Sequence, residues 1–392
     1  MAAQAVRAFG YGLTSVLLGV TLDRLGFSGV AAGMVLTAVV AGTALASLAL
    51  VRLAAQHGRR RCYVVLYVAL GVSGIVFAFA HSAWTLAIVA LAGALSTEVV
   101  ESGPFTSLEQ AMLAEELTGP SLAAGFGVYN AIATAAGSLG ALAAVLPSAT
   151  RRWIDVPAQR WFLLLVATAG AGVLIASRLT SRVEQHDNEP TPRRSGLGPS
   201  RKIVGRLSAL FALDAFGGGF VVQSFVAFWL ARRFDASAAS VGVVFFAVGI
   251  LQTASFLVAP ILARRFGLLT TMVATHLPSN VLLFAIAFAP TFPVAVALWL
   301  ARVAIGQMDV PTRQAYVMTL VEPAERVPAA AYTNTARYLV RPAGPALAGV
   351  AQSLALGAPF AIGGAIKGIY DVVLWRWFRR IPLRHDDALE VR

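Results

Sequence analysis

The sequence predicts an all-α membrane protein with twelve transmembrane helices in two related six-helix halves. Its 392 residues are 58% hydrophobic and only 13% charged, about half the charged fraction of a typical soluble domain. Apolar runs of about 20 residues, the length of a helix that crosses a bilayer, recur along nearly the whole chain. A polar stretch near the middle separates six such runs from six more.

Each half supplies six candidate spans. We expect the first six at residues 5–23, 28–50, 62–81, 84–103, 120–146 and 158–178, and the second six at 203–230, 237–263, 268–289, 291–309, 329–354 and 357–378. A second span follows the first almost at once, and no convincing cleavage site ends the first, so it is interpreted as a retained signal-anchor helix. The predicted organisation is an N-terminal bundle (1–179), a cytoplasmic linker (180–202), a C-terminal bundle (203–378) and a cytoplasmic tail (379–392).

The net charge of +12 has a membrane explanation. Most of the Lys and Arg residues lie in short segments between apolar runs, where cations orient helices and meet anionic lipid headgroups. No separate basic domain is present, so nucleic acid is not expected as a partner. With the N-terminus inside, the cytoplasmic segments hold most of these cations. We therefore predict a multi-pass protein of the cell's inner or plasma membrane, with both termini cytoplasmic.

The two halves resemble each other at a nearly constant offset. The stretch Arg7-Ala-Phe-Gly-Tyr-Gly12 aligns with Asp214-Ala-Phe-Gly-Gly-Gly219, and Pro104 aligns with Pro311, both at a shift of about 207 residues. Further along, two more pairs align at a shift of about 204: Asn130 with Asn334, and Gly140 with Gly344. Matches in the same order indicate a duplicated unit, which many transporters arrange around a site near the bilayer midplane.

The basic turn between the second and third spans carries a family resemblance. It ends in Gly58-Arg59-Arg60, and the corresponding turn of the second half, residues 263–267, keeps Arg265 and Gly267. With twelve spans in six plus six and a polar central linker, this turn resembles the major facilitator superfamily over essentially the whole chain. The family's usual Asp and basic residue are replaced here by Ala55 and Gln56.

The resemblance implies a secondary transporter that moves a small molecule by rocking of its two halves. Residues 103–111 and 308–316 look like bacterial drug- or metabolite-efflux relatives. Within these stretches, Glu109, Asp309 and Arg313 are expected to be cytoplasmic gate contacts, together with the two basic turns. The Gly-Pro motif of the family's proton antiporters is missing from the fifth span, whereas Gly344-Pro345 in the eleventh span resembles it.

Ionisable residues inside the spans are the candidates for the substrate and proton pathway, because a charge in the bilayer core usually faces a cavity or a partner. Asp214 lies near mid-membrane in a glycine-rich stretch, and Arg302 lies at a similar depth. They form either a fixed structural pair or part of the transport site. Glu98 and Glu101 lie in the fourth span, where either is neutralised by Arg7 or exchanges protons.

Four further polar positions complete the candidate pathway. Arg337 and Arg341 are four residues apart in the eleventh span and share a helix face. They bind an anion or, alternatively, hold carbonyls and acids of neighbouring helices such as Asp309. The aligned residues Asn130 and Asn334 are added as pathway candidates. Lys367 and Asp371 have the same spacing in the twelfth span, and we expect them to satisfy each other.

Enzymatic and metal chemistry find little support. The sequence has no phosphate-binding glycine loop, no zinc-type His-Glu pair and no nucleophile elbow. Cys62 is the only cysteine, and the five histidines, His276 among them, show no ligand spacing. We expect no cofactor and no metal. The predicted function is proton-coupled export of a small organic or amphiphilic compound by a monomer. Uptake or facilitated diffusion of a polar or anionic metabolite, and a non-transporting sensor or scaffold, remain alternatives.

Overall fold

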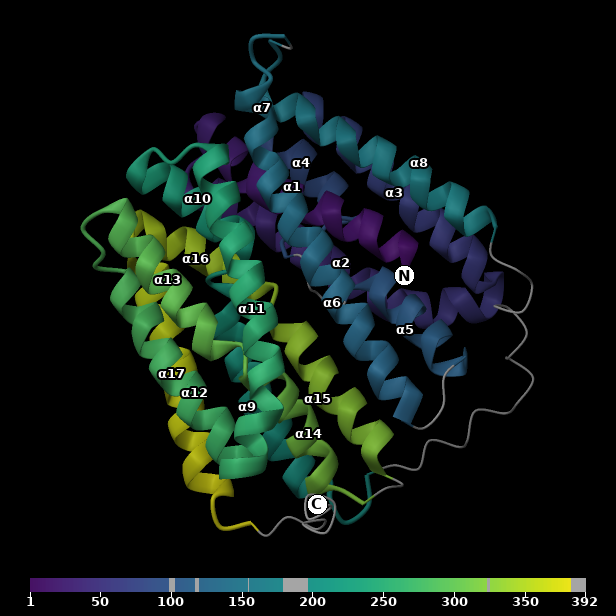
Figure 1. The fold of residues 1–392 in the computed structure, drawn as a ribbon, viewed down its shortest axis with the longest axis vertical. Coiled ribbons are helices and arrows are strands. Elements are labelled where there is room, and N and C mark those ends of the chain that lie inside the picture. Colours follow the sequence, from purple (N-terminus) through teal and green to yellow (C-terminus); the bar gives the residue numbers. More distant parts are fainter. Residues whose placement is uncertain (99–102, 117–119, 154, 179–196, 323–324, 382–392) are drawn as a thin grey trace. The chain divides into compact units, whose positions relative to one another are not determined.

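The computed structural model describes residues 1–392 except 99–102, 117–119, 154, 179–196, 323–324 and 382–392, and the described part is built from helices without strands (Figure 1). The α-helices of the first half are α1 (Ala2–Arg24), α2 (Gly29–His57), α3 (Arg59–Phe79), α4 (Ala83–Ala90), α5 (Pro104–Glu116), α6 (Pro120–Leu142), α7 (Leu146–Ala149) and α8 (Leu164–Ser177). Those of the second half are α9 (Arg201–Gly219), α10 (Gln223–Phe234), α11 (Ala238–Phe266), α12 (Leu268–Ile286), α13 (Phe292–Gly306), α14 (Asp309–Leu320), α15 (Arg326–Val340), α16 (Ala343–Leu354) and α17 (Ala358–Phe378). Two 3₁₀ segments, η1 (Ala143–Val145) and η2 (Ala158–Leu163), adjoin α6 and α8.

The predicted spans coincide with these helices, but three are not continuous. Within the span expected at 84–103, the helix ends at Ala90 and the described residues 91–98 are not helical; Gly93 there has a φ of +72° that favours glycine. The span expected at 203–230 is divided into α9 and α10, and the one at 329–354 into α15 and α16. Hydropathy predicts the depth of a segment in the membrane, and it does not report where the helical hydrogen bonds are interrupted.

Nine helical segments within the described residues are long and apolar enough to cross a membrane. They correspond to nine of the expected twelve spans. The expected fourth span is interrupted after Ala90, and the eleventh and twelfth carry several charged residues. The chain is therefore a multi-pass helical membrane protein, and the count of twelve stays a prediction.

Packing divides the chain into two compact units. The first comprises residues Met1–Glu189 and Val222–Ile250, and the second comprises Pro190–Val221 and Leu251–Arg392. Thus α10 and the first part of α11 pack with α1–α8, whereas α9 packs with α12–α17. The predicted boundaries at the central linker stay a prediction.

Both basic turns have the same backbone geometry. Gly58 joins α2 to α3 with φ +85° and ψ 148°, and Gly267 joins α11 to α12 with φ +83° and ψ 157°. In each turn the glycine N–H donates to the carbonyl oxygen four residues earlier, Ala54 at 3.0 Å and Ala263 at 2.9 Å. Such dihedral angles are essentially restricted to glycine. The repeated glycines of the two turns therefore serve the same local structural purpose.

The repeated glycines within the helices lie at close helix crossings. A Cβ atom added at Gly140 on α6 would lie 1.9 Å from the carbonyl oxygen of Phe9 on α1, and one added at Gly12 would lie 1.9 Å from that of Gly137. In the second unit, a Cβ on Gly344 of α16 would lie 2.4 Å from the Cα of Gly219 on α9. The two aligned pairs thus mark equivalent crossings, where small residues let backbones approach closely.

Gly140→Ala is expected to lower the stability of the first unit by about 1–3 kcal/mol, because the new methyl group meets backbone and can be accommodated only by separating α1 from α6. The measurement is the melting temperature of the detergent-purified protein. Gly170→Ala on α8 is the matched control, since nothing lies within 4 Å of a Cβ at that position. Equal melting temperatures for the two variants would contradict a tight crossing.

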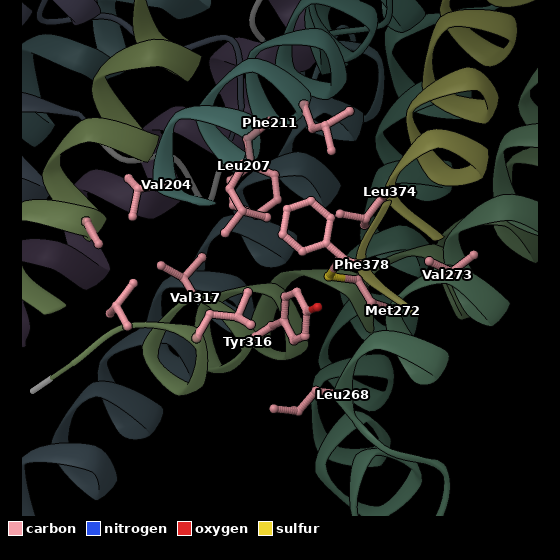
Figure 2. Close-up of a cluster of buried hydrophobic side chains, with 14 of the residues drawn as sticks. Val204, Leu207, Phe211, Leu268, Met272, Val273, Tyr316, Val317, Leu374 and Phe378 are labelled. Carbon is pink, nitrogen blue, oxygen red and sulfur yellow. The ribbon is translucent and has the colours of Figure 1, made fainter. Parts of the chain in front are cut away.

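The second unit has a continuous apolar core (Figure 2). Four of its members lie one helical turn or less from an ionisable residue on the same helix: Phe211 precedes Asp214, Met272 precedes His276, Tyr316 follows Arg313 and Leu374 follows Asp371. Since one turn advances a helix by about 5.4 Å, an apolar layer lies directly beside these charges. The members shown with labels are Val204, Leu207, Phe211, Leu268, Met272, Val273, Tyr316, Val317, Leu374 and Phe378.

Candidate functional site

Asp214 is the centre of a buried ionic cluster in the second unit. It lies on α9, and its side chain is only 4% exposed. Its Oδ1 accepts a hydrogen bond from the ammonium of Lys367 on α17, and its Oδ2 accepts one from Nη1 of Arg313 on α14 at 3.1 Å. Nη1 of Arg337 on α15 lies 3.8 Å from the same Oδ2. Three cations from three helices therefore converge on one carboxylate.

Arg313 connects this carboxylate to a second one. Its Nη1 also donates to Oδ2 of Asp309, one turn earlier on α14, at 2.7 Å. Asp309 is 2% exposed and Arg313 is 8% exposed. The guanidinium carbon of Arg313 lies 5.6 Å from the ring centre of Phe211, which belongs to the apolar core. Burial is tolerated because each charge has a partner of opposite sign.

An imidazole adds a titratable group to the cluster. His276 on α12 places Nδ1 2.8 Å from Oδ1 of Asp371 on α17, and its Nε2 lies 3.8 Å from Oδ1 of Asp214. Asn280, one turn further along α12, donates from Nδ2 to Oδ2 of Asp371 at 2.8 Å. Asp371 is fully buried, and both of its oxygens are used. His276 thus lies between two carboxylates.

These contacts link three carboxylates to three basic side chains. The acids are Asp214, Asp309 and Asp371, and the cations are Lys367, Arg313 and Arg337. The linked set is electrically balanced when His276 is neutral. Such a set can be buried in an apolar surrounding, whereas a change of one charge has a large effect there. The arrangement is therefore suited to sensing the arrival of a proton or a charged substrate.

Two expected pairings are corrected by the structure. Asp214 contacts Lys367, Arg313 and Arg337 rather than the expected Arg302, whose guanidinium carbon lies 4.8 Å from the ring centre of Trp299. Lys367 and Asp371 do share a face of α17, but they contact other helices instead of each other. Contacts between helices are preferred because they satisfy buried groups on both elements.

The first unit contains a buried ion pair of its own. Arg7 on α1 donates from Nη2 to Oε2 of Glu109 on α5 at 2.6 Å. The same oxygen accepts from the hydroxyl of Tyr129 at 2.5 Å, and Oε1 accepts from the hydroxyl of Tyr63. The guanidinium also lies 4.7 Å from the ring centre of Phe105. Glu109 is therefore a buried carboxylate with several donors, and its expected role as a gate contact stays a prediction.

The pairs in the two units correspond with reversed polarity. Arg7 and Asp214 are aligned by the internal repeat, and each contacts the segment that follows its half's fourth span: Arg7 contacts α5, and Asp214 contacts α14. In the first unit the first helix supplies the cation, and in the second unit α9 supplies the anion. The two repeats therefore have an ion pair at corresponding positions, with the acidic and the basic residue exchanged between the helices.

The contacts described so far do not bring the remaining predicted site residues to either cluster. Arg7 pairs with Glu109 rather than with Glu98, and Glu101 lies outside the described residues. Asn130 and Asn334 are exposed. Arg341 lies one turn from Arg337, at the end of α15. In the basic turns, Arg60 donates to the carbonyl of Ser177 at 2.8 Å, Arg265 lies over Phe266, and Arg59 adjoins Gly58.

Sequence reasoning missed His276 as a site residue. The sequence shows no metal-ligand spacing around His276, and the described residues contain no group of three or more His, Cys, Asp or Glu side chains suited to a metal. His276 lies within the apolar run 268–289, and an ionisable residue inside such a run is a candidate site residue. The same criterion identifies Asp214. Lys367 satisfies that criterion as well.

Comparisons with known proteins agree with this architecture. Residues 1–345 match the family model described as Major Facilitator Superfamily. A curated relative, the "Uncharacterized membrane protein YJR124C" of Saccharomyces cerevisiae, is 23% identical over 406 residues, which cover 94% of this chain and 91% of the relative. The inward-open structure of the xylose transporter XylE from E. coli matches with a TM-score of 0.74 at 14% identity. The match covers 99% of this chain and 97% of the XylE chain. The nucleoside transporter NupG has a TM-score of 0.72 at 14% identity, with 96% of each chain covered.

The family match and the transporter fold, with paired charges buried among the helices, indicate a membrane transporter rather than an enzyme. The chain belongs to the Major Facilitator Superfamily.

Proposed function

We propose that this chain is a proton-coupled secondary transporter that exports a small organic or amphiphilic compound in exchange for protons. The observation that carries the proposal is the Asp214 cluster, in which a buried carboxylate and a buried imidazole lie with two buried cations and the partly exposed Arg337 in the second unit. Ionisable groups at such positions mark ion and substrate pathways by default. We propose an orientation with both termini in the cytoplasm, because this orientation places most of the segments that contain Lys and Arg on the cytoplasmic side.

Uptake is a second candidate, favoured by two of the structural neighbours. Their names describe a D-xylose-proton symporter, with a TM-score of 0.70 at 14% identity, and a nucleoside transporter. If this chain resembles them in activity as well as in fold, it carries a small polar metabolite inward together with protons. The balanced charges at Asp214 are compatible with either direction, because direction depends on the order in which proton and substrate bind.

The two directions are distinguished in reconstituted vesicles. A thermal-shift screen against nucleosides, pentoses and common drugs first identifies a compound that binds the folded protein and raises its melting temperature. Radiolabelled samples of that compound are then offered to proteoliposomes with either an acidic or an alkaline interior. An exchanger accumulates the compound when the interior is acidic, since protons leave as the compound enters. A symporter accumulates it when the interior is alkaline.

Two other outcomes would overturn the proposal of proton coupling. Equilibration without accumulation under both gradients indicates facilitated diffusion. Binding without any movement indicates a sensor or scaffold that has kept the fold. Arg151→Ala serves as a matched control with an intact cluster, because Arg151 is 79% exposed and pairs only loosely with Asp155 at 3.7 Å.

A further inference from the structure

The ring nitrogens of His276 have unequal surroundings. Nδ1 lies 2.8 Å from Oδ1 of Asp371 and 3.2 Å from Nδ2 of Asn280; because an ionised carboxylate only accepts hydrogen bonds and the Asn280 amide donates to Oδ2 of Asp371, the hydrogen is assigned to Nδ1. Asn280 holds the other oxygen of Asp371 and so fixes the carboxylate. The neutral ring then has its lone pair on Nε2. That lone pair faces Oδ1 of Asp214 at 3.8 Å, too far for a hydrogen bond in this arrangement.

Lys367 competes for that same oxygen. Its ammonium donates to Oδ1 of Asp214, while Arg313 and Arg337 lie at Oδ2. The aliphatic stem of Lys367 passes α9 at Gly217, where an added Cβ would lie 2.8 Å from the lysine Cγ. Gly217 therefore provides the space by which Lys367 reaches Asp214.

We propose that Nε2 of His276 is the proton-accepting atom of the cluster, and that the protonated imidazole displaces Lys367 from Oδ1 of Asp214. When a proton binds to Nε2, this nitrogen changes from a hydrogen-bond acceptor into a hydrogen-bond donor toward the carboxylate of Asp214. Asp371 holds the ring in position and balances the charge on the other side. The proposal deepens the proposed function, on which its role in transport rests, by assigning the proton to a particular atom.

Displacement of Lys367 changes which helices are tied together. Before protonation, Asp214 links α9 to α17 through Lys367, and Asp371 links α17 to α12 through His276. Afterwards, the imidazolium links α9 directly to α12, while the ammonium of Lys367 is released for another acceptor. A single proton thus exchanges one interhelical contact for another, which is the local event that a conformational switch requires.

Other charged groups in the second unit influence the binding of a proton at His276. The helices packed against α12 include α13, α14 and α17. These helices and α9 carry the following titratable or charged residues near the site: Asp214 on α9, Arg302 on α13, Asp309 and Arg313 on α14, and Lys367, Tyr370 and Asp371 on α17. The ring of Tyr370 lies edge-on to the imidazole, with centres 5.8 Å apart. His276 is the imidazole of this set, the kind of side chain whose ordinary pKa lies between pH 5 and pH 8.

The test needs no substrate. Full-length protein with ¹⁵N-labelled histidine is purified in detergent, and its ring nitrogens are followed by NMR between pH 5 and pH 8.5. The signals of His276 are identified by their absence in His276→Gln, and the exposed residues His57 and His81 are internal references. We expect a neutral ring with hydrogen on Nδ1 at the alkaline end and a doubly protonated ring at the acidic end. Asp371→Asn is expected to remove the preference for hydrogen on Nδ1.

Asp214→Asn is expected to abolish the doubly protonated form within this range, because Nε2–H then lacks its carboxylate partner. A ring that stays neutral throughout in the wild-type protein would overturn the proposal, and this result does not depend on any variant folding. An unchanged transition in Asp214→Asn would overturn it as well. The vesicle experiment tests the proposed function separately. Absence of proton-driven accumulation would contradict that function even if His276 takes up a proton as expected.

Discussion

Asp214→Asn is expected to lower the free energy of unfolding by about 3–5 kcal/mol and to abolish gradient-driven transport. Removal of the carboxylate leaves the buried Lys367 and the partly exposed Arg337 without their anion, while Arg313 keeps Asp309. Stability is measured by unfolding of purified protein in mild detergent with increasing denaturant. Transport is measured in proteoliposomes and expressed per folded molecule. Exchange of substrate at equal concentrations is expected to survive, because it needs no net release of a proton.

Two further variants separate the structural from the functional part of this effect. Lys367→Met alone is expected to cost less stability, since Asp214 keeps Arg313 and Arg337. The double variant Asp214→Asn with Lys367→Met restores the charge balance and most of the stability, as expected for coupled neighbours. Gradient-driven transport by the double variant would show that Asp214 is a structural partner only, and it would reject the cluster as the coupling site.

Glu109→Gln is expected to lower the stability of the first unit by a comparable amount, about 3–5 kcal/mol. Glu109 is the carboxylate that balances Arg7, which is 4% exposed, and a glutamine amide has no charge to do so. A glutamine amide has one oxygen in place of the two that accept from the hydroxyls of Tyr63 and Tyr129, so one of these hydrogen bonds is lost together with the ionic partner. The melting temperature in detergent and the denaturant midpoint are the measurements.

The control for this prediction is an exposed pair in the same unit. Asp155→Asn removes the partner of Arg151, and both side chains are about four-fifths exposed. No measurable change is expected there, because water solvates both charges. A second variant, Arg7→Met with Glu109→Gln, removes both charges and is expected to recover part of the lost stability. If Glu109→Gln is as stable as Asp155→Asn, the buried pair is not a stabilising contact.

The helical architecture was predictable because the bilayer imposes the length and the composition of each span. The interruptions after Ala90, between α9 and α10 and between α15 and α16 were not, because hydropathy does not depend on helix continuity. The glycine repeats were visible in the sequence, and the structure gives their cause: Gly140 and Gly344 lie where two backbones meet. Spacing alone does not distinguish such a crossing from chance matches in glycine-rich helices.

The candidate site was predictable in part. Asp214 stands out because a carboxylate in an apolar run needs a partner. Its partners did not follow from the sequence, since Lys367 is 153 residues away and the choice among several buried cations is made by helix packing. Arg7 likewise pairs with Glu109, 102 residues away, whereas one of Glu98 and Glu101 was the expected partner. The function of Asp214, Arg302, Arg337 and Arg341 in a pathway stays a prediction.

The balance of three acids against three cations determines how turnover responds to voltage. Under the proposal for His276, a proton that binds alone gives the linked residues one net positive charge, and moving one charge through the membrane potential is worth about 2.3 kcal/mol per 100 mV. Because the proposed exchange moves proton and cargo in opposite directions, a neutral cargo leaves one charge moved per cycle, a monocation cancels it and a monoanion doubles it. Comparison of transport at different membrane potentials therefore reports the charge of the cargo before its chemical identity is known.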